Sequence, residues 1–203
     1  MSPAPRTLVV LNGSPVRGSS IDLMIAAMIE GAEAAGGRAT HFRCHELAVR
    51  PCEACGPDAT TGYCIFNDAM DEVYAALESA HAIAVASPIY FDTVSAQLKL
   101  VIDRCNCITP LVTLPSGVQD FVPKWQRTRR GVFITSHSAA HRYDLAEHTV
   151  RGFLKWVGAK WEETLVYAHS DNQVGSVATQ TAVLEHARAT GQRLIASAPL
   201  PPA

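Results

Sequence analysis

A loop rich in glycine and serine follows the first apolar run of the chain and is suited to hold an anion. It reads Asn12-Gly13-Ser14-Pro15-Val16-Arg17-Gly18-Ser19-Ser20. Glycines let a backbone turn closely around a ligand, the serines offer hydroxyl donors, and Arg17 could add a charged contact. A helix expected directly after the loop would point its N-terminal amides at the same place. The loop lacks the glycine patterns of P-loop enzymes and of dinucleotide sites, so it favours the phosphate of a mononucleotide; an ordinary glycine-serine turn with a helix cap is the alternative.

Two further loops carry side chains suited to chemistry, and each follows a later apolar run. They are Ser87-Pro88-Ile89-Tyr90-Phe91 and Ser136-His137-Ser138-Ala139-Ala140-His141. The first has the apolar and aromatic character of a wall for a flat ring, although a strand end with core aromatics has it too. In the second, the imidazole of His137 could bind a polar ring edge or transfer a proton, whereas His141 could equally face solvent or cap a helix.

A cysteine-rich loop offers metal ligands. Cys52, Cys55 and Cys64 have the spacing C-x2-C-x8-C. Three thiolates could hold an iron–sulfur cluster with Asp58, or a Zn²⁺ ion with Asp58 or His45. Because cluster sites are ordinarily all-cysteine, we expect no metal here and cysteines that pack a subunit contact. Two more cysteines, Cys105 and Cys107, lie at an expected helix end without a matching pair, and we expect them to be buried.

Apolar runs and helical patterns alternate along the chain and predict how these loops are positioned. The expected strands span residues 7–11, 38–43, 80–86, 131–135 and 161–167, with a helical segment after each. Such alternation calls for a parallel sheet with helices on both faces, in an α/β fold. Ligands of such sheets bind beyond the carboxyl ends of the strands, which are the ends that the loops described above follow. Asn67 or Asp68 could cap the helix before the third strand, and residues 108–127, with three prolines, are expected to form a long loop.

Composition limits the function classes. The chain has 203 residues, 18% of them charged, and a formal net charge of -2. We expect a single domain over residues 1–203 with a frayed tail at about 199–203. Nothing in this balance calls for nucleic acid or a membrane surface, and the lack of a long apolar run or a signal-like start predicts a cytoplasmic protein. The six cysteines are then better explained as thiols, metal ligands or redox groups than as a disulfide framework.

Leu11-Asn12-Gly13-Ser14-Pro15, followed by Arg17-Gly18-Ser19-Ser20, resembles the FMN-phosphate loop of the NADPH-dependent FMN reductase and flavodoxin-like family. The resemblance continues through residues 86–91, 94–99 and 102–104, and more weakly at Gly175 and residues 187–191. It implies a flavodoxin-like three-layer sandwich whose five-stranded parallel sheet has the order 2-1-3-4-5. The family usually has arginine at the position of Val16, so its phosphate role passes to Arg17 or is lost. Lys99, Asp103 and Arg104 are expected at a helix surface or as loop anchors.

The resemblance also implies a site and an activity. FMN would be bound by Asn12, Ser14, Pro15, Arg17, Ser19, Ser20, Pro88, Ile89, Tyr90, Phe91, Ser136, His137 and His141, with Tyr90 and His137 closest to the chemistry. Hydride would pass from NAD(P)H to the flavin and then, by a ping-pong mechanism, to a quinone, an azo or nitro compound, or free flavin. Such proteins commonly form homodimers or homotetramers, in which residues 108–127 could help to close a neighbour's site.

The cysteine loop resembles, in part, the motif of iron–sulfur flavoproteins, with Asp58 where the third cysteine would stand. This resemblance implies an alternative, an electron-transfer protein with a 4Fe-4S cluster. A third hypothesis is a flavodoxin-fold scaffold that has lost its cofactor, for which Val16 is the only sign.

Overall fold

The computed structural model describes residues 4–55, 63–125, 127–138, 142–169 and 173–197. The expected tail, His141 and Asp58 lie outside the described residues. The strands are β1 (Thr7–Asn12), β2 (Arg38–Arg43), β3 (Ala82–Pro88), β4 (Leu111–Thr113), β5 (Gln119–Phe121), β6 (Arg129–Ser138) and β7 (Ala159–His169). The helices are α1 (Ser20–Ala34), α2 (Met70–Ser79), α3 (Ala96–Arg104), α4 (Asp144–Trp156) and α5 (Thr181–Ala196).

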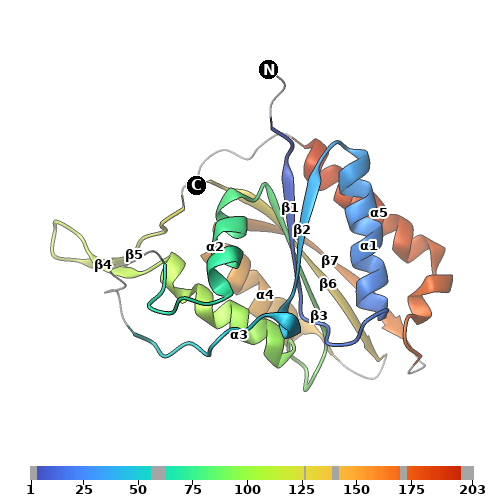
Figure 1. Ribbon diagram of the computed structural model, residues 1–203, viewed down its shortest axis with the longest axis horizontal. Helices are drawn as coiled ribbons and strands as arrows, with labels where there is room; N and C mark the ends of the chain where they lie inside the picture. The colour runs from blue at the N-terminus through green and yellow to red at the C-terminus, as the bar shows by residue number, and fades with distance from the viewer. Residues whose placement is uncertain (1–3, 56–62, 126, 139–141, 170–172, 198–203) are drawn as a thin grey trace.

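Five parallel strands form the central sheet in the order β2-β1-β3-β6-β7 (Figure 1). The fourth and fifth expected strands correspond to β6 and β7, so the order 2-1-3-4-5 implied by the resemblance is confirmed. The helices α1 and α5 cover one face, and α2, α3 and α4 cover the other. The strand order reverses at β1 and β3, which places the loops after these strands at the point where such sheets bind ligands.

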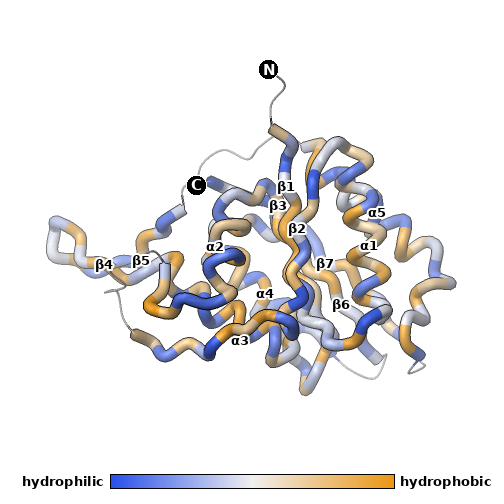
Figure 2. The backbone as a smooth tube through the Cα atoms, in the orientation of Figure 1, coloured by the Kyte–Doolittle hydropathy of each residue, from blue (hydrophilic) through white to orange (hydrophobic). Residues whose placement is uncertain are grey.

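Alternation along the strands builds two apolar layers. In β1, Val9 and Leu11 belong to the layer under α2, α3 and α4, whereas Leu8 and Val10 belong to the layer under α1 and α5. The central strands are buried on both faces, and their apolar character is visible in Figure 2. This is why the sequence shows them as continuous apolar runs rather than as alternating patterns.

The helices α1 and α5 pack with their backbones in contact. A Cβ atom at Gly31 would lie 1.9 Å from the carbonyl oxygen of Arg188, and one at Gly191 would lie 1.9 Å from that of Met28. Only glycine leaves room for this approach. The pair therefore fixes how α5 sits on α1 and, through α1, on the sheet.

The segment expected as one long loop is in part a hairpin, which corrects that prediction. Strands β4 and β5 pair antiparallel around a turn in which the amide of Gly117 donates to the carbonyl of Leu114 at 2.8 Å. Gly117 has φ +82°, as such a tight turn requires. The strands have three residues each, too few to show a period in the sequence. The hairpin projects from the body of the molecule (Figure 1).

The N-cap of α2 is Ala69, which corrects the prediction that Asn67 or Asp68 takes this position. Asp68, one residue before the cap, still contributes, because its carboxylate accepts the amide of Met70 at 3.0 Å. Among the described residues, no helix is long and apolar enough to cross a lipid bilayer.

Candidate functional site

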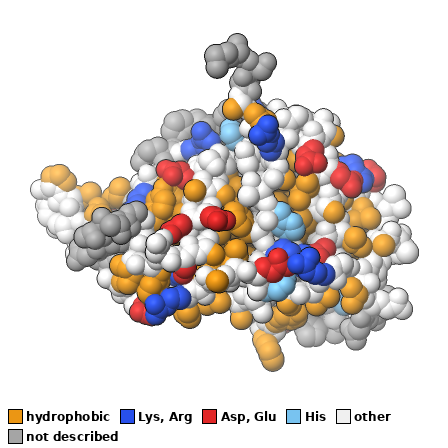
Figure 3. All heavy atoms as spheres, in the orientation of Figure 1, with side chains coloured by type: hydrophobic (Ala, Val, Ile, Leu, Met, Phe, Trp, Pro, Cys, Tyr) orange, Lys and Arg blue, Asp and Glu red, His pale blue; other side chains and the backbone are white. Residues whose placement is uncertain are grey.

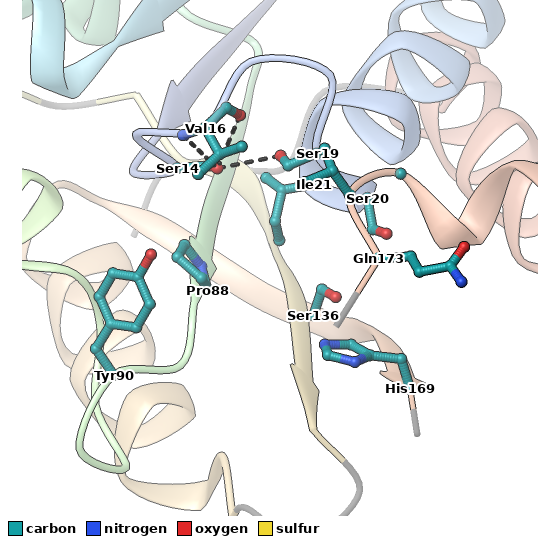
Figure 4. Close-up of a pocket in the computed structure, with 12 residues that line it drawn as sticks. Ser14, Val16, Ser19, Ser20, Ile21, Pro88, Tyr90, Ser136, His169 and Gln173 are labelled. Carbon is teal, nitrogen blue, oxygen red and sulfur yellow. Dashed lines mark hydrogen bonds between the residues drawn. The ribbon is translucent and has the colours of Figure 1, made fainter. Parts of the chain in front are cut away.

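An open cavity of about 260 Å³ lies at the carboxyl end of the sheet, where the loops after β1, β3, β6 and β7 meet (Figure 4). Six predicted site residues lie in its wall: Ser14, Ser19, Ser20, Pro88, Tyr90 and Ser136. The structure adds six more: Val16, Ile21, His169, Gln173, Val174 and Gly175. The cavity therefore combines serine hydroxyl groups with apolar surface, as a phosphorylated ring compound would need.

Two serine hydroxyls mark the end of the cavity nearest to α1. The Oγ atoms of Ser14 and Ser19 lie 3.1 Å apart, and Ser19 is the N-cap of α1, where its Oγ accepts the amide of Asp22 at 3.3 Å. The positive end of the helix dipole adds to these donors. Hydroxyls at the start of a 15-residue helix are a suitable cradle for phosphate oxygens.

Asn12 and Asp22 shape this loop from behind and do not line the cavity. The Oδ1 of buried Asn12 accepts the amide of Ser14 at 2.9 Å, and its Nδ2 donates to Asp22 at 2.8 Å. Asp22 also accepts the amide of Gly18 at 2.8 Å, where φ is +70°, and both of its oxygens accept from Arg43. Sequence reasoning missed Asp22, although the spacing Ser19-x-x-Asp22 is that of a helix-capping box.

His41 completes the support of the loop. Its Nε2 lies 3.2 Å from the Nδ2 of Asn12. Burial, reinforced by the nearby Arg43 guanidinium, lowers the pKa of His41. A neutral imidazole can accept the hydrogen bond that Asn12 offers, so the shift agrees with the contact.

Arg17, which was expected to add a cationic contact to the ligand, does not line the cavity. Its side chain is 75% exposed and pairs with Glu46, away from the hydroxyl pair. Pro15 also lies outside the wall, and Val16 takes the place between Ser14 and Ser19. Among the described residues that line the cavity there is no lysine or arginine, so neutral donors and the helix end would have to bind an anion.

The segment predicted to form the ring wall divides into exposed and buried parts. Pro88 and Tyr90 line the cavity, and the side chain of Ile89 is in the core, 8% exposed. Tyr90 and Thr93 exchange backbone hydrogen bonds of 3.0 and 3.1 Å around a tight turn. Both central residues of this turn, Phe91 and Asp92, have positive φ, at 51° and 61°. The strained turn leaves Phe91 fully exposed at the edge of the site.

Strand alternation separates Ser136 from His137. Ser136 faces the cavity, whereas the ring of His137 stacks at 5.3 Å from that of Tyr143, toward α4. His137 is 8% exposed; its Nδ1 lies 2.7 Å from the carbonyl oxygen of Ser138, and its Nε2 has no hydrogen-bond partner among the described residues. The loop after β7, which adds His169 and Gln173, was missed although the same sheet-edge rule applies to it.

The three cysteines of the predicted metal loop lie around a second, larger cavity of about 480 Å³. Cys107 lines it as well, together with Arg104 and the apolar side chains of the hairpin. Among the described residues, no three cysteine, histidine or acidic side chains converge closely enough to hold one metal ion. Arg104 anchors the loop, as expected, by donating to the carbonyl of Arg50 at 2.9 Å and to Asp68 at 2.7 Å.

Residues 6–170 match the family model described as NADPH-dependent FMN reductase. The chain belongs to this family. Among the curated relatives of this family member, an iron-sulfur flavoprotein of Methanosarcina thermophila is 35% identical over 94 residues, which are 46% of this chain and 49% of that protein. An iron-sulfur flavoprotein of Archaeoglobus fulgidus is 32% identical over 92 residues, 45% of this chain and 42% of that protein. The chain thus spans about half the length of the curated relatives that it matches.

Solved structures confirm the fold of this FMN reductase family member. An NAD(P)H:quinone oxidoreductase from Methanothermobacter marburgensis superposes with a TM-score of 0.65 at 16% identity, covering 94% of this chain and 100% of that one. A flavodoxin from the domain Archaea gives 0.54 at 11% identity, with 94% and 96% covered. At these identities the likeness concerns the fold, which is flavodoxin-like as predicted.

Proposed function

We propose that this protein binds FMN in the cavity at the carboxyl end of the sheet and acts as an NAD(P)H-dependent oxidoreductase. The observation that carries the proposal is the union, in one cavity, of the Ser14–Ser19 hydroxyl pair at the start of α1 with the wall of Pro88 and Tyr90. The first suits a phosphate and the second a flat apolar ring. Membership of the FMN reductase family supports the same ligand.

The residues present fit each part of FMN. Ser14, Ser19 and the helix end would hold the phosphate, and Ser136 would lie beside the polar side of the ring. Pro88 and Tyr90 would hold its flat face, with Phe91 at the mouth. The bound flavin would supply the hydride chemistry, so the chain itself needs to bind the ring, orient it and leave one face open.

The acceptor is proposed to be small: a quinone, an azo or nitro compound, or free flavin. The mechanism is proposed to be ping-pong, in which the nicotinamide leaves before a second substrate enters over the same face; the open cavity is compatible with this order. Tyr90, 43% exposed, is the catalytic candidate that lies in the wall. His137 remains a candidate through its buried Nε2, which has no partner among the described residues.

Anaerobic mixing of the FMN-loaded protein with NADPH or NADH tests the activity. We expect either nicotinamide to bleach the visible flavin absorption, and a quinone added afterwards to restore it. Initial rates should give parallel double-reciprocal lines when both substrates are varied. A flavin that neither nicotinamide reduces would refute the proposal.

A second candidate is an electron-transfer protein of the iron–sulfur flavoprotein type. The observation that favours it is the cysteine-lined cavity, and the names of the curated relatives agree. Iron analysis and the visible spectrum of freshly purified protein distinguish the two: a plain flavin spectrum without iron supports the reductase, and iron with a broad thiolate absorption supports the carrier.

A further inference from the structure

The second cavity brings together four thiols from two distant parts of the chain. Cys52, Cys55 and Cys64 come from the loop after β2, and Cys107 comes from the 3₁₀ turn Cys105–Ile108 that follows α3. All six cysteines lie in the described part of the chain, and none is paired in a disulfide. The neighbouring Cys105 and Cys44 are buried in the core and do not line the cavity. Four cysteines are the usual ligand set of an iron–sulfur cluster.

The thiols surround a space and do not converge on a point. No three potential ligands in the described ranges are close enough to hold one ion, yet the cavity that the four thiols line measures about 480 Å³. This arrangement does not suit a tetrahedral Zn²⁺ site, in which all ligands approach one atom. A cluster is a larger group in which each thiolate binds a different iron, so its ligands stand further apart.

Charge and polarity at the cavity favour an anionic group. Arg104 lines it with a fully buried side chain that is paired with Asp68, and its Nε has no hydrogen-bond partner among the described residues. A 4Fe-4S core with four thiolates is negatively charged, so the Nε–H that Asp68 leaves unbonded would stabilise it as a hydrogen-bond donor. Leu111, Phe121 and Trp156 form the apolar part of the wall, which limits the access of water.

Cys107 is held in place before any ligand arrives. Its Sγ donates to the carbonyl oxygen of Arg104 at 3.3 Å and lies 3.5 Å from the Tyr74 hydroxyl. That hydroxyl donates to the same carbonyl at 2.7 Å. A thiol held on a short turn, in the same cavity as three more, is a suitable fixed ligand.

We infer that Cys107 supplies the fourth thiolate of a 4Fe-4S cluster in this cavity. The other three ligands are Cys52, Cys55 and Cys64, and each thiol gives up its proton when it binds iron. The cysteine motif of the loop lacks its third member, since Asp58 stands in that position of the sequence. Cys107, 43 positions beyond Cys64 but in the same cavity, takes that role. The inference rests on the second candidate function above and is independent of the FMN site.

Anaerobic reconstitution of the full chain with ferrous iron and sulfide tests it. Iron and acid-labile sulfide are measured per chain, and the dithionite-reduced protein is examined by electron paramagnetic resonance. The wild-type protein should take up about four of each and give a cluster signal. The variants C107A and C52A should keep less than about a quarter of this content.

Two variants serve as controls. C105A, in the same turn, should keep the wild-type iron content, as should D58A, which removes the alternative carboxylate ligand. FMN affinity and far-ultraviolet circular dichroism, recorded for every variant, separate cluster loss from misfolding and from failure of the FMN site. Full cluster content in C107A, cluster loss in D58A, or no iron and sulfide in the wild-type protein would each overturn the inference.

Discussion

At the scale of single residues, Asp22 determines what the anion-binding loop can offer. Its carboxylate holds the amide of Gly18 and pairs with Arg43, so neither of these donors is directed to a ligand. Arg17 is likewise engaged by Glu46. The loop therefore presents hydroxyls and helix amides, and little positive charge, to a phosphate.

Val16 is the position at which a charge would help most, because it lies in the wall next to the Ser14 hydroxyl. We expect V16R to tighten FMN binding by about three- to tenfold, through one partly exposed contact with the phosphate. The gain should shrink as salt is added, because exposed charges are screened. Fluorescence titration of the apoprotein at two ionic strengths measures both effects.

Arg17 provides the matched control. Since its side chain pairs with Glu46 outside the cavity, R17A should change FMN affinity by less than about twofold. A tenfold weaker affinity would show that Arg17 leaves Glu46 for the phosphate.

At the scale of elements, the close packing of α1 on α5 should contribute measurably to stability. We expect G191A to lower the free energy of unfolding by roughly 1–3 kcal/mol, since its Cβ would overlap the Met28 carbonyl. For a chain of this size that corresponds to about 3–10 °C in melting temperature. Differential scanning calorimetry measures it.

A substitution at Gly152 of α4 should have the opposite effect on stability. A Cβ there would meet no atom within 4 Å, so G152A should raise stability by up to about 1 kcal/mol through helix propensity. Equal destabilisation by both substitutions would contradict the packing account.

The Asp68–Arg104 pair joins the start of α2 to the end of α3 and should make the free energy of unfolding depend on pH in the acidic range. Burial alone would raise the pKa of Asp68, but hydrogen bonds from Arg104 and from the amides of Met70 and Arg50 outweigh it and lower that pKa. The stabilisation is therefore complete above the ordinary carboxyl pKa and is lost as pH falls toward the lower, folded value.

D68N should thus destabilise the protein at pH 7 by roughly 2–4 kcal/mol, because a buried guanidinium loses its ion pair. The difference from wild type should narrow below about pH 4, where the carboxylate of the unfolded chain becomes protonated, and should vanish only below the lower pKa of the folded state. Melting temperatures of D68N and wild type, recorded from about pH 3 to about pH 7 so that the range includes the carboxyl pKa, measure this difference. The exposed Lys99–Asp103 pair is the control, and D103N should lower the free energy of unfolding by less than about 1 kcal/mol. A D68N effect that does not change with pH would argue against the ion pair.

These elements also show what the sequence could and could not predict. The buried strands and their order followed from apolar runs and from the resemblance, because burial on both faces leaves a strong pattern. The hairpin β4–β5 could not be found because each strand is too short to carry a period. In the site, the sequence predicted that the segment at the end of β6 contributes, but not which face of the strand each side chain takes. Because side chains alternate along a strand, Ser136 lines the cavity and His137 does not.

At the scale of the whole molecule, the projecting hairpin exposes apolar side chains that a monomer would leave in water. Val118 is 59% exposed and Phe121 is 52% exposed. Orange side chains lie along this projection in Figure 3. Exposed apolar patches of this kind commonly mark an interface, which supports the expected homodimer or homotetramer.

We expect V118D to weaken self-association at least about tenfold, because a charge would be buried at the contact. Sedimentation equilibrium over a range of concentrations measures the change in mass. L145D, at an exposed leucine of α4, should leave the mass unchanged. A wild-type protein that is monomeric at all concentrations would contradict the expectation.

The central claim, that the loop after β1 holds the phosphate of FMN, is tested most directly by comparing FMN with riboflavin, which has the same ring and no phosphate. Titration of the apoprotein should show FMN binding at least about 100-fold more tightly, the equivalent of one or two charge-assisted hydrogen bonds. In S14A most of this advantage should disappear while riboflavin affinity is unchanged. Equal affinity of the wild-type protein for FMN and riboflavin would contradict the account.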